Sequence, residues 1–313
     1  MERKYKLTDK HIQHNGHKLY RIQALKSFAD VKEGDFGGYI ESEDNLSHNG
    51  TCWVYDNAVV YDNAKVFDSA NVFGNAVVYG NADVLNNAEV YNTAEVYGNA
   101  KVYGCAKVYG CAEVHRNAEV YGYAEVYGNA EVYDNAEVCG NARICGDAKI
   151  YDYAWVYGNA KISGDANIYD YARICGDAYI LENAKACDHV KVSGYAEIRG
   201  YAKVYGIAKV RGDAKVYGYA EVHGNAEVYG HAEIYGNAAV CENTDYIVFK
   251  NWWSSGRYFT WTRSNNMWKV GCFYGTGEEL IMKAYNDSKE SGREYERVVK
   301  YVESILADDN YAE

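Results

Sequence analysis

Asn99-Ala-Lys-Val-Tyr-Gly104 is one copy of a six-residue unit that fills the middle of the chain without interruption. Asn129-Ala-Glu-Val-Tyr-Asp134 and Asp213-Ala-Lys-Val-Tyr-Gly218 are further copies, and Asn45-Leu-Ser-His-Asn-Gly50 is a degenerate first copy. Between residues 45 and 242 the register holds through 33 hexads, and the chain contains no proline. A repeat this strict decides the fold, because each unit must bury its apolar side against its neighbours.

The hexad alternates small or aliphatic residues with polar or aromatic ones, which is the period of a β-strand with Ala and Val on one face. The Gly-Asn or Asp-Asn pair that follows tolerates positive φ, so the chain turns there. Four strand residues and a two-residue corner, repeated, predict a solenoid. A helix is excluded, because apolar positions six apart with frequent glycine do not form a 3.6-residue stripe.

This pattern closely resembles the hexapeptide-repeat family of left-handed parallel β-helices, in which an aliphatic residue and a small residue four positions later point inward. Val60 with Ala64 and Val102 with Ala106 match those places. The resemblance covers about two thirds of the chain and implies three hexads per coil, a triangular cross-section and about 11 coils. We therefore expect an all-β solenoid over residues 45–244, with an N-terminal hairpin cap over 1–44 and a small C-terminal α+β module over 245–313.

Three hexads per coil place every eighteenth residue in one column, which makes the surface predictable. The residues expected to be buried at the fourth hexad position include Val60, Val102, Val132, Ile168 and Val216. One outer column is predicted to contain Tyr61, Tyr79, Tyr97, His115, Tyr133, Tyr151 and Tyr169. These rings either support the sheet or form an adhesive surface.

A second outer column is predicted to carry mostly alternating charges, which suits a parallel stack because like charges on neighbouring strands repel. Its members are Glu89, Lys107, Glu125, Arg143, Lys161, Tyr179, Glu197, Lys215 and Glu233. We expect Lys107, Glu125 and Arg143 to be exposed.

Composition indicates an acidic protein with a net charge of −12 and no stretch long and apolar enough to span a membrane. The N-terminus lacks the hydrophobic run of a signal peptide, so we expect a cytoplasmic location. The nine cysteines follow the repeat register, not a ligand spacing. Cys139 and Cys175 would lie about 9.6 Å apart, too far for a disulfide. We expect reduced thiols, no metal and no cofactor.

The first 44 residues do not repeat, and an Asn-Gly turn at residues 15 and 16 predicts a β-hairpin. In that hairpin His14 and His17 face each other, while His11 points to the opposite side with Tyr20. One metal ion therefore cannot collect all three histidines. We expect the segment to cover the first coil, whose open end exposes unpaired strand edges.

The entry into the repeat carries a more specific resemblance. Phe28-Ala-Asp-Val-Lys-Glu-Gly34, Gly37-Gly-Tyr39, Asn45-Leu-Ser and Gly50-Thr-Cys-Trp-Val-Tyr-Asp56 resemble the entry segment of the YdcK-like group of hexapeptide-repeat proteins. Members of that group are often labelled putative transferases. The resemblance covers this entry and the repeat, so it supports the fold and implies little about chemistry.

After Asn243 the composition changes abruptly. Three strands are predicted over residues 246–250, 257–263 and 267–274, joined by tight turns. A helical region follows from Gly277, with a break near residues 291–292 between two apolar stripes. This arrangement looks like C-terminal modules of phage and prophage proteins of gut bacteria.

Three classes of function remain, and the sequence favours a non-catalytic scaffold or protein-interaction protein, in which a rigid rod holds recognition modules at its ends. A phage-encoded protein that acts on a host factor is one form of this hypothesis. The second class is a hexapeptide-type acyltransferase. In that family the site lies between subunits of a trimer, beside a loop that interrupts the hexads and near a catalytic histidine. Here no loop interrupts the repeat, so we expect no binding of acetyl-CoA.

The histidines of the repeat carry no catalytic signature. His115 and His223 stand where tyrosine usually stands, and His189 and His231 occupy corners. No matched acid or oxyanion device is evident beside any of them.

The third class is a nucleic-acid binder that uses the aromatic and basic residues of the C-terminal module as a stacking platform. Its candidate residues are Trp252, Trp253, Trp261 and Trp268 with Lys250, Arg257, Arg263 and Lys269. The acidic chain argues against it and allows instead an acidic mimic of nucleic acid. An aromatic core is the plainer interpretation.

Recognition is predicted in the C-terminal module, because a monotonous repeat offers many equivalent surfaces whereas binding hot spots are enriched in Trp, Tyr and Arg. The candidate partner-binding residues are Trp252, Trp253, Arg257 and Arg263. Strand alternation would point Trp252 and Trp253 to opposite faces, leaving at least one exposed. The same patch is a candidate for packing subunits into a homo-oligomer. No catalytic or metal-binding residue is predicted.

Overall fold

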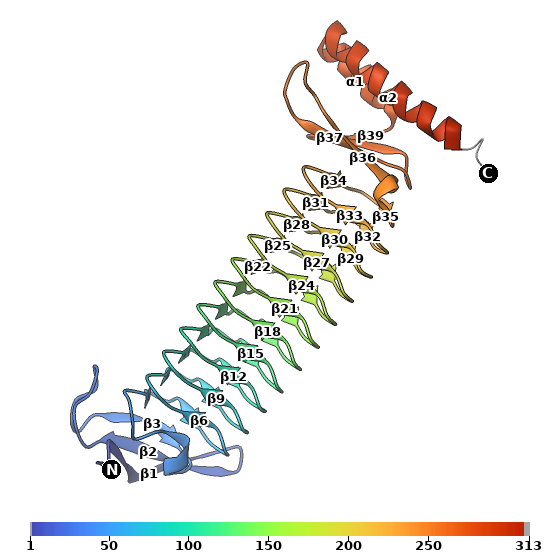
Figure 1. The fold of residues 1–313 in the computed structure, drawn as a ribbon. Helices are drawn as coiled ribbons and strands as arrows, with labels where there is room; N and C mark the ends of the chain where they lie inside the picture. The colour runs from blue at the N-terminus through green and yellow to red at the C-terminus, as the bar shows by residue number, and fades with distance from the viewer. Residues whose placement is uncertain (1, 310–313) are drawn as a thin grey trace.

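The computed structural model describes residues 2–309 and forms a long rod with a module at each end (Figure 1). Three parallel sheets run along the rod, and each is built from two-residue strands. Each coil contributes one strand to each sheet, so paired residues lie 18 apart in sequence, as Lys101 and Glu119 do. The predicted β-solenoid of about 11 coils is confirmed.

Each face of the rod is named here by its first strand within the repeat. The β4 face consists of β4 Trp53–Val54, β7 Asn71–Val72, β10 Glu89–Val90, β13 Lys107–Val108, β16 Glu125–Val126, β19 Arg143–Ile144, β22 Lys161–Ile162, β25 Tyr179–Ile180, β28 Glu197–Ile198, β31 Lys215–Val216 and β34 Glu233–Ile234. The β5 face contains β5 Val59–Val60, β8 Val77–Val78, β11 Glu95–Val96, β14 Glu113–Val114, β17 Glu131–Val132, β20 Lys149–Ile150, β23 Asn167–Ile168, β26 Lys185–Ala186, β29 Lys203–Val204, β32 Glu221–Val222 and β35 Ala239–Val240. The β6 face consists of β6 Lys65–Val66, β9 Asp83–Val84, β12 Lys101–Val102, β15 Glu119–Val120, β18 Glu137–Val138, β21 Trp155–Val156, β24 Arg173–Ile174, β27 Lys191–Val192, β30 Lys209–Val210 and β33 Glu227–Val228.

The core of the rod is a continuous stack of the alanines and the Val or Ile residues of the hexads. The five residues predicted to be buried are all 0% exposed: Val60, Val102, Val132, Ile168 and Val216. Arg143 is exposed as predicted, whereas Lys107 and Glu125 are only partly exposed. Side chains of the adjacent coils partly shield them from solvent; the Lys107 ammonium, for example, lies 2.8 Å from the Glu89 carboxylate.

The corners explain the sixth hexad position. Gly128 has φ +75, and a Cβ there would lie 3.0 Å from the backbone nitrogen of Gly146 in the next coil. Asp170 adopts φ +56 instead, and its carboxylate accepts a hydrogen bond at 3.2 Å from the backbone N–H of Asp188. Glycine therefore reaches the left-handed conformation freely, and aspartate adds an acceptor for the following coil.

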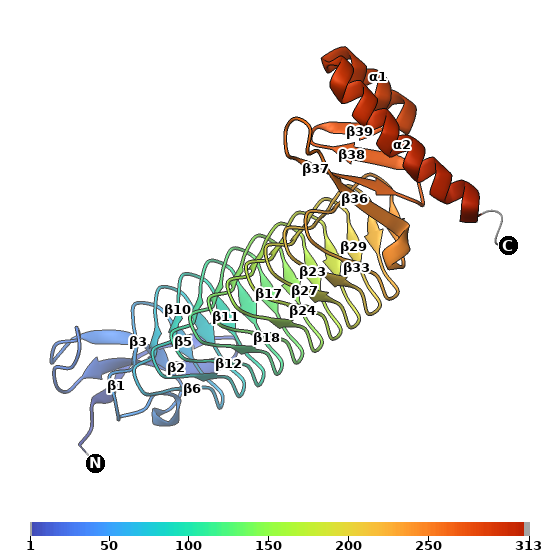
Figure 2. The same ribbon diagram turned by 45° about the horizontal axis from the view of Figure 1, so that its top comes forward.

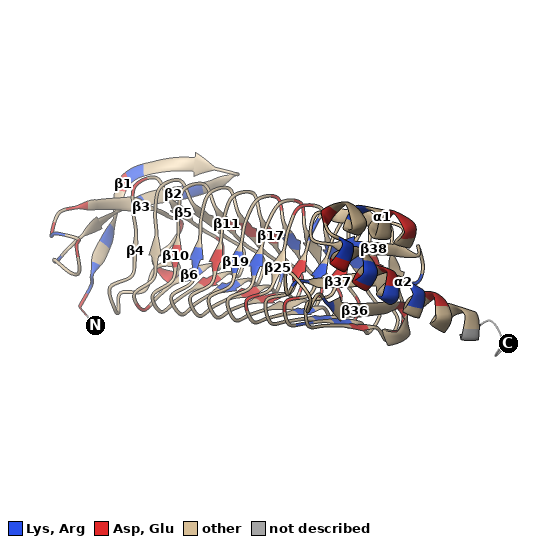
Figure 3. Ribbon diagram, turned by 90° about the horizontal axis from the view of Figure 1, so that it is seen from above, with Lys and Arg blue, Asp and Glu red and all other residues tan. Residues whose placement is uncertain are grey.

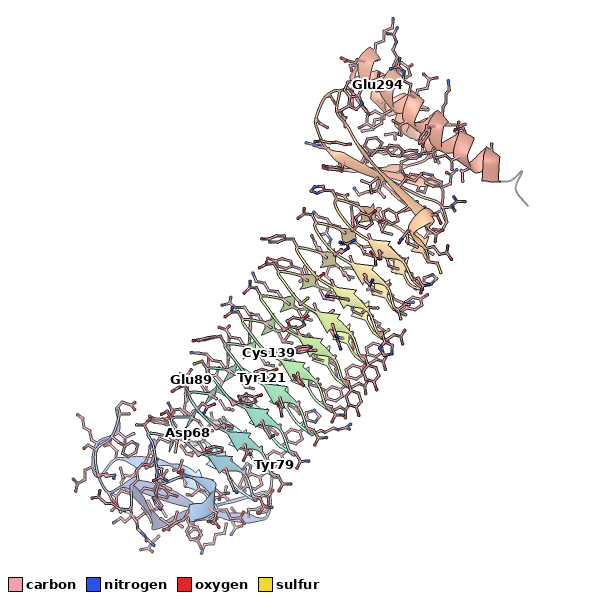
Figure 4. The ribbon with its side chains drawn as sticks, in the orientation of Figure 1. Asp68, Tyr79, Glu89, Tyr121, Cys139 and Glu294 are labelled. Carbon is pink, nitrogen blue, oxygen red and sulfur yellow. The ribbon has the colours of Figure 1, made fainter. Side chains whose placement is uncertain are left out.

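The predicted aromatic column is confirmed. Rings from Tyr61 to Tyr169 stack with centroid separations between 4.7 and 5.2 Å, and Tyr79 is labelled in Figure 4. Burial within the stack raises the pKa of Tyr79 and of Tyr151 to about 12. This packing supports the sheet, as offset aromatic stacks do.

The N-terminal cap is the predicted hairpin, and it also supplies a third strand. β1 Tyr5–His14 and β2 His17–Ala24 are antiparallel, with His14 opposite His17 and His11 opposite Tyr20. β3 Phe36–Ile40 pairs with β2 and then in parallel with β5, so the cap closes the strand edge of the β5 face. The short helix η1 Glu43–Asn45 follows. Leu19 of the hairpin packs with Val59 and Tyr61 on the outer side of that face.

The C-terminal module begins after η2 Asn243–Asp245 and has one antiparallel sheet covered by two helices (Figure 2). The sheet consists of β36 Tyr246–Lys250, β37 Tyr258–Thr262, β38 Met267–Val270 and β39 Phe273–Gly275. The helices are α1 Gly277–Asp287 and α2 Lys289–Asp309. Among the described residues, no helix has the length and apolar character needed to cross a bilayer.

Two sequence predictions for this module were wrong in detail. The stretch 267–274 is two strands, because Gly271 at φ +56 reverses the chain. The helices break at Ser288, which is extended, and not near residues 291–292. Gly292 lies inside α2, and a glycine fits there because the ring of Tyr285 lies 2.2 Å from where a Cβ would stand.

Candidate interaction site at the C-terminal module

The loop between β36 and β37 carries three of the four predicted partner-binding residues. It is braced from inside by Asn251, which is 3% exposed. The Asn251 side chain donates to the hydroxyl of Tyr295 on α2 at 3.1 Å and accepts from the backbone N–H of Ser254 at 2.9 Å. The backbone N–H of Asn251 donates to the carbonyl of Arg257 at 2.7 Å, which closes the loop. These hydrogen bonds satisfy the polar groups of the buried Asn251 side chain and brace the loop from within.

At least one of the two tryptophans is exposed, as the sequence predicted, but strand alternation does not set them on opposite faces, because both lie in this loop. Trp252 is 75% exposed, and its ring makes an edge contact with Trp253 at 6.0 Å. Trp253 is half-buried and packs against Tyr295 with ring centroids 5.0 Å apart. A large aromatic side chain displayed on a braced loop is a typical feature of a protein-binding surface.

Arg257 ends the loop on its exposed side. Among the described residues, no carboxylate lies within 4.0 Å of its guanidinium group. Arg257 lines two hollows: one of about 230 Å³ beside Asn251 and Lys283, and one of about 410 Å³ beside Lys215 and His231. Arg257 is therefore a cation of the same loop as Trp252, with no carboxylate within 4.0 Å among the described residues.

Arg263 does not belong to the same patch. It follows β37 whereas Arg257 precedes it, so the two are about 20 Å apart along the strand. The backbone N–H of Arg263 donates to the carbonyl of Asp245 at 2.8 Å, next to the last coil. The structure thus places Trp252, Trp253 and Arg257 in one loop, with the two tryptophan rings in contact, and leaves Arg263 at the opposite end of the strand.

Two of the four tryptophans proposed as a stacking platform for nucleic acid are buried. Trp261 and Trp268 are 1% and 2% exposed and fill the core of the module with Phe259. Lys269 is also buried and lies over the rings of Tyr217 and Tyr235. A row of stacking aromatics with free cations is therefore not formed by these residues.

The module is fixed to the rod by contacts at the last coil. The Thr260 hydroxyl accepts the backbone N–H of Glu233 at 2.9 Å, and the Tyr246 hydroxyl donates to the carbonyl of Glu227 at 2.7 Å. His231 stacks on Tyr258 with centroids 4.1 Å apart. These contacts set the orientation of the 251–257 loop relative to the rod.

The histidines of the repeat stack on neighbouring tyrosine rings. His115 stacks between Tyr97 and Tyr133 at 4.7 and 5.1 Å, and burial lowers its pKa. His231 does have an acid neighbour that the sequence interpretation missed, since its Nδ1 lies 3.5 Å from a carboxylate oxygen of Asp213. The sequence could have indicated this contact, because the two residues are 18 positions apart and therefore lie in neighbouring coils. No Ser, Thr or Cys side chain is among the described residues that line the hollow beside this pair.

Two groups of side chains bring possible metal ligands within 4.8 Å of one another: His17 with Glu41 and Asp62, and Asp170 with Cys187 and Asp188. His17 already contacts both carboxylates, at 3.0 Å to Glu41 and 3.6 Å to Asp62. All nine cysteines, which lie within the described residues, are free thiols.

No family model and no curated protein matches this chain.

Proposed function

We propose that this protein is a non-catalytic rod that presents a recognition loop, residues 251–257, to a protein partner. The observation that carries the proposal is Trp252, which is 75% exposed although the loop around it is braced by buried hydrogen bonds. Exposing a tryptophan to water is unfavourable, and burial of such a ring against a partner recovers that free energy. Arg257 of the same loop adds a cation that has no carboxylate within 4.0 Å among the described residues.

The rod supports this role by its rigidity. Its core is continuous from coil to coil, and no hexad is interrupted between residues 51 and 242. A displayed loop on such a body holds a fixed distance and direction from the N-terminal cap. The YdcK-like resemblance of the entry segment supports a hexapeptide-repeat origin for the rod. The phage-like arrangement of the C-terminal module makes a protein of an enteric bacterial host the partner that we propose to test first.

The test is quantitative affinity capture from a lysate of an enteric bacterium, with tagged wild-type protein and the variants Trp252→Ala and Arg257→Glu. The matched control is Tyr123→Ala, because Tyr123 is 68% exposed but lies on the rod. A hot-spot tryptophan contributes at least about 2 kcal/mol, which corresponds to roughly a thirtyfold change in affinity. We expect one partner to be retained by wild type and Tyr123→Ala and lost from Trp252→Ala. Equal capture by all four proteins would contradict the proposal.

Calorimetry with acetyl-CoA separates this proposal from the acyltransferase alternative. We expect no heat of binding. Saturable binding at micromolar concentration that His115→Ala or His223→Ala abolishes would favour the enzyme instead.

A further inference from the structure

The β6 face carries its charges in blocks, whereas the β4 face mostly alternates them, with Arg143 and Lys161 as an exception. On the β4 face, Glu89 lies next to Lys107, and acidic and basic strands follow one another along the rod (Figure 3). From β12 to β33, the outward residues of the β6 face are Lys101, Glu119, Glu137, Trp155, Arg173, Lys191, Lys209 and Glu227. Neighbouring like charges repel. The stability of a single rod therefore does not account for this order.

Ion pairs within the chain neutralise only the two ends of this series. Lys101 lies 3.4 Å from the Glu119 carboxylate, and Lys209 lies 2.6 Å from that of Glu227. The four residues between them have no such pair within residues 2–309. No carboxylate lies within 4.0 Å of Arg173 or Lys191, and no cation lies within 4.0 Å of Glu137. Arg173 and Lys191 are both exposed.

The unpaired residues at the centre of the face are complementary to themselves. A two-fold axis that lies in the contact plane, parallel to the strands and between β21 and β24, sets a second copy face to face with the first and antiparallel to it. It brings Glu137 opposite Lys191 of the second copy and Trp155 opposite Arg173. The strands on either side continue the match, with Glu119 opposite Lys209 and Lys101 opposite Glu227. Each ion pair and the cation–π pair then occurs twice, as two-fold symmetry requires.

Exposed apolar side chains follow one edge of the same part of the face. Tyr153, Tyr171 and Ile207 are 56%, 51% and 55% exposed, and the two tyrosine rings stack 5.1 Å apart. Each stands two residues before an outward residue of the β6 face. The two-fold axis places this edge against the same edge of the second copy, with Tyr153 opposite Tyr171. Burial of these rings provides a hydrophobic contribution.

The other two faces are less suited to this contact. The β5 face also groups like charges, as at Glu113 and Glu131, but ion pairs within the chain join its blocks: Lys149 lies 2.9 Å from Glu131, and Lys203 lies 2.9 Å from Glu221. The hairpin residue Leu19 also packs over Val59 and Tyr61 at the start of this face. On the β4 face, ion pairs such as that of Lys107 with Glu89, at 2.8 Å, already neutralise neighbouring strands.

The size of the contact also fits. Eight strands about 4.8 Å apart and five residues of width give an area of about 38 by 15 Å on each copy. The total of about 1,100 Å² lies near the lower limit for specific interfaces.

We propose that two copies of this protein associate side by side and antiparallel through their β6 faces, with the two-fold axis between Trp155 and Arg173. The inference is independent of the loop at residues 251–257, so either proposal can fail without the other. Because six ion pairs hold a contact of modest area, the dimer forms reversibly and weakens as salt screens the charges.

Sedimentation velocity and light scattering of the full chain test the association at about 50 mM and about 500 mM NaCl. We expect the mass to approach that of a dimer at low salt and to fall towards that of a monomer at high salt. Small-angle X-ray scattering should show almost the same maximum dimension for both species, because the rods lie alongside each other. A monomer at all accessible concentrations, or an end-to-end dimer of doubled length, would overturn the proposal.

Charge reversal tests the register. Lys191→Glu and Glu137→Lys each set two pairs of like charges opposite one another, and we expect each to raise the dissociation constant about tenfold or more. The double variant restores opposite charges and should restore the dimer. Lys161→Glu is the matched control, since Lys161 is also an exposed lysine next to a cation, Arg143, but lies on the β4 face. Circular dichroism confirms the fold of each variant.

The double variant distinguishes two possible ligands of the β6 face, a second copy of the protein and a polyanion. Rescue of the dimer by the double variant supports the proposal. If the protein is monomeric and Lys191→Glu instead abolishes binding of a single-stranded DNA oligomer, the face is a polyanion site and the proposal is wrong. Equal dimerisation of all variants would also overturn it.

Discussion

Each position of the hexad has one physical task, and neighbouring residues can therefore differ completely in their contribution. Ala at the second position and Val or Ile at the fourth fill the core, where the residues of the repeat are essentially fully buried. The third and fifth positions point outward and interact with the residue 18 positions away, through ion pairs or stacked rings. The sixth position adopts positive φ and is occupied by Gly or, in most other coils, by Asp or Asn.

Adjacent residues of one strand test this division. Ile162 is 0% exposed, and we expect Ile162→Ala to lower the free energy of unfolding by about 2–5 kcal/mol, since it leaves a cavity between stacked coils. Lys161→Ala removes an outward side chain and should change the free energy of unfolding by no more than about 0.5 kcal/mol. Urea denaturation measures both. Similar losses in the two variants would show that the third position also carries packing that this assignment omits.

At the scale of elements, the two end modules solve the problem of unpaired strand edges in different ways. The cap adds β3 to the β5 face by parallel pairing, and Gly38 permits this because a Cβ there would lie 2.5 Å from the carbonyl oxygen of Ala58. The C-terminal module instead covers the last coil with β36 and β37. Removal of the module would expose the edges of the last coil, so point variants are a safer test of its function than truncation.

The contact of His17 with the first coil makes the cap sensitive to pH. The hydrogen bond to Glu41 raises the pKa of His17 above 6.5, and the same contact lowers the pKa of Glu41 below 4.5. The contribution of His17 to stability is thus complete below pH 6.5 and is lost as pH rises through its folded pKa. That of Glu41 is present above pH 4.5 and is lost as pH falls through its folded pKa. The contact is strongest between these limits.

We therefore expect His17→Gln to lower the melting temperature more at pH 5.5 than at pH 8, as measured by thermal denaturation of both proteins. His11→Gln is the control, because His11 lies on the opposite side of the hairpin from the rod. A difference that is constant with pH, or that grows towards pH 8, would show that His17 acts by packing alone.

The sequence predicted the rod almost completely and the end modules only in outline. The rod is predictable because the register is local and repeated, so a position such as Val102 has the same environment in every coil. The strand boundary at Gly271 and the helix boundary at Ser288 depend on tertiary packing, which a single copy of a motif does not reveal. For the candidate site, Trp252 and Arg257 were proposed from the sequence by residue type alone. The brace by Asn251 and Tyr295 joins segments 44 residues apart, and no sequence pattern indicated it.

At the scale of the whole molecule, the length of the rod increases by one strand spacing with each coil. Its length and the angular position of the C-terminal module both depend on how many residues separate the ends. Three hexads return the chain to the same face one coil further along. The repeat therefore fixes both the distance and the direction of the 251–257 loop relative to the cap.

Deletion of whole coils tests this dependence. We expect removal of residues 117–134, which form three hexads, to preserve a cooperative unfolding transition and to shorten the rod by about 4.8 Å in small-angle scattering. Removal of residues 117–119 alone shifts the register by half a hexad, so core and surface residues exchange places beyond that point. That variant should lose several kcal/mol of stability or unfold in separate steps. Equal stability of the two deletions would contradict the assignment of the hexad positions.

The central claim is that the loop at residues 251–257 binds a protein partner, and site-specific photo-crosslinking tests it most directly. A benzoylphenylalanine residue is introduced at position 252 in one sample and at position 123 in another, and each is irradiated in the same bacterial lysate. We expect a single dominant adduct of one protein from position 252 and none of that protein from position 123. If position 252 yields no specific adduct, or if both positions yield the same adducts, the loop is not the recognition site.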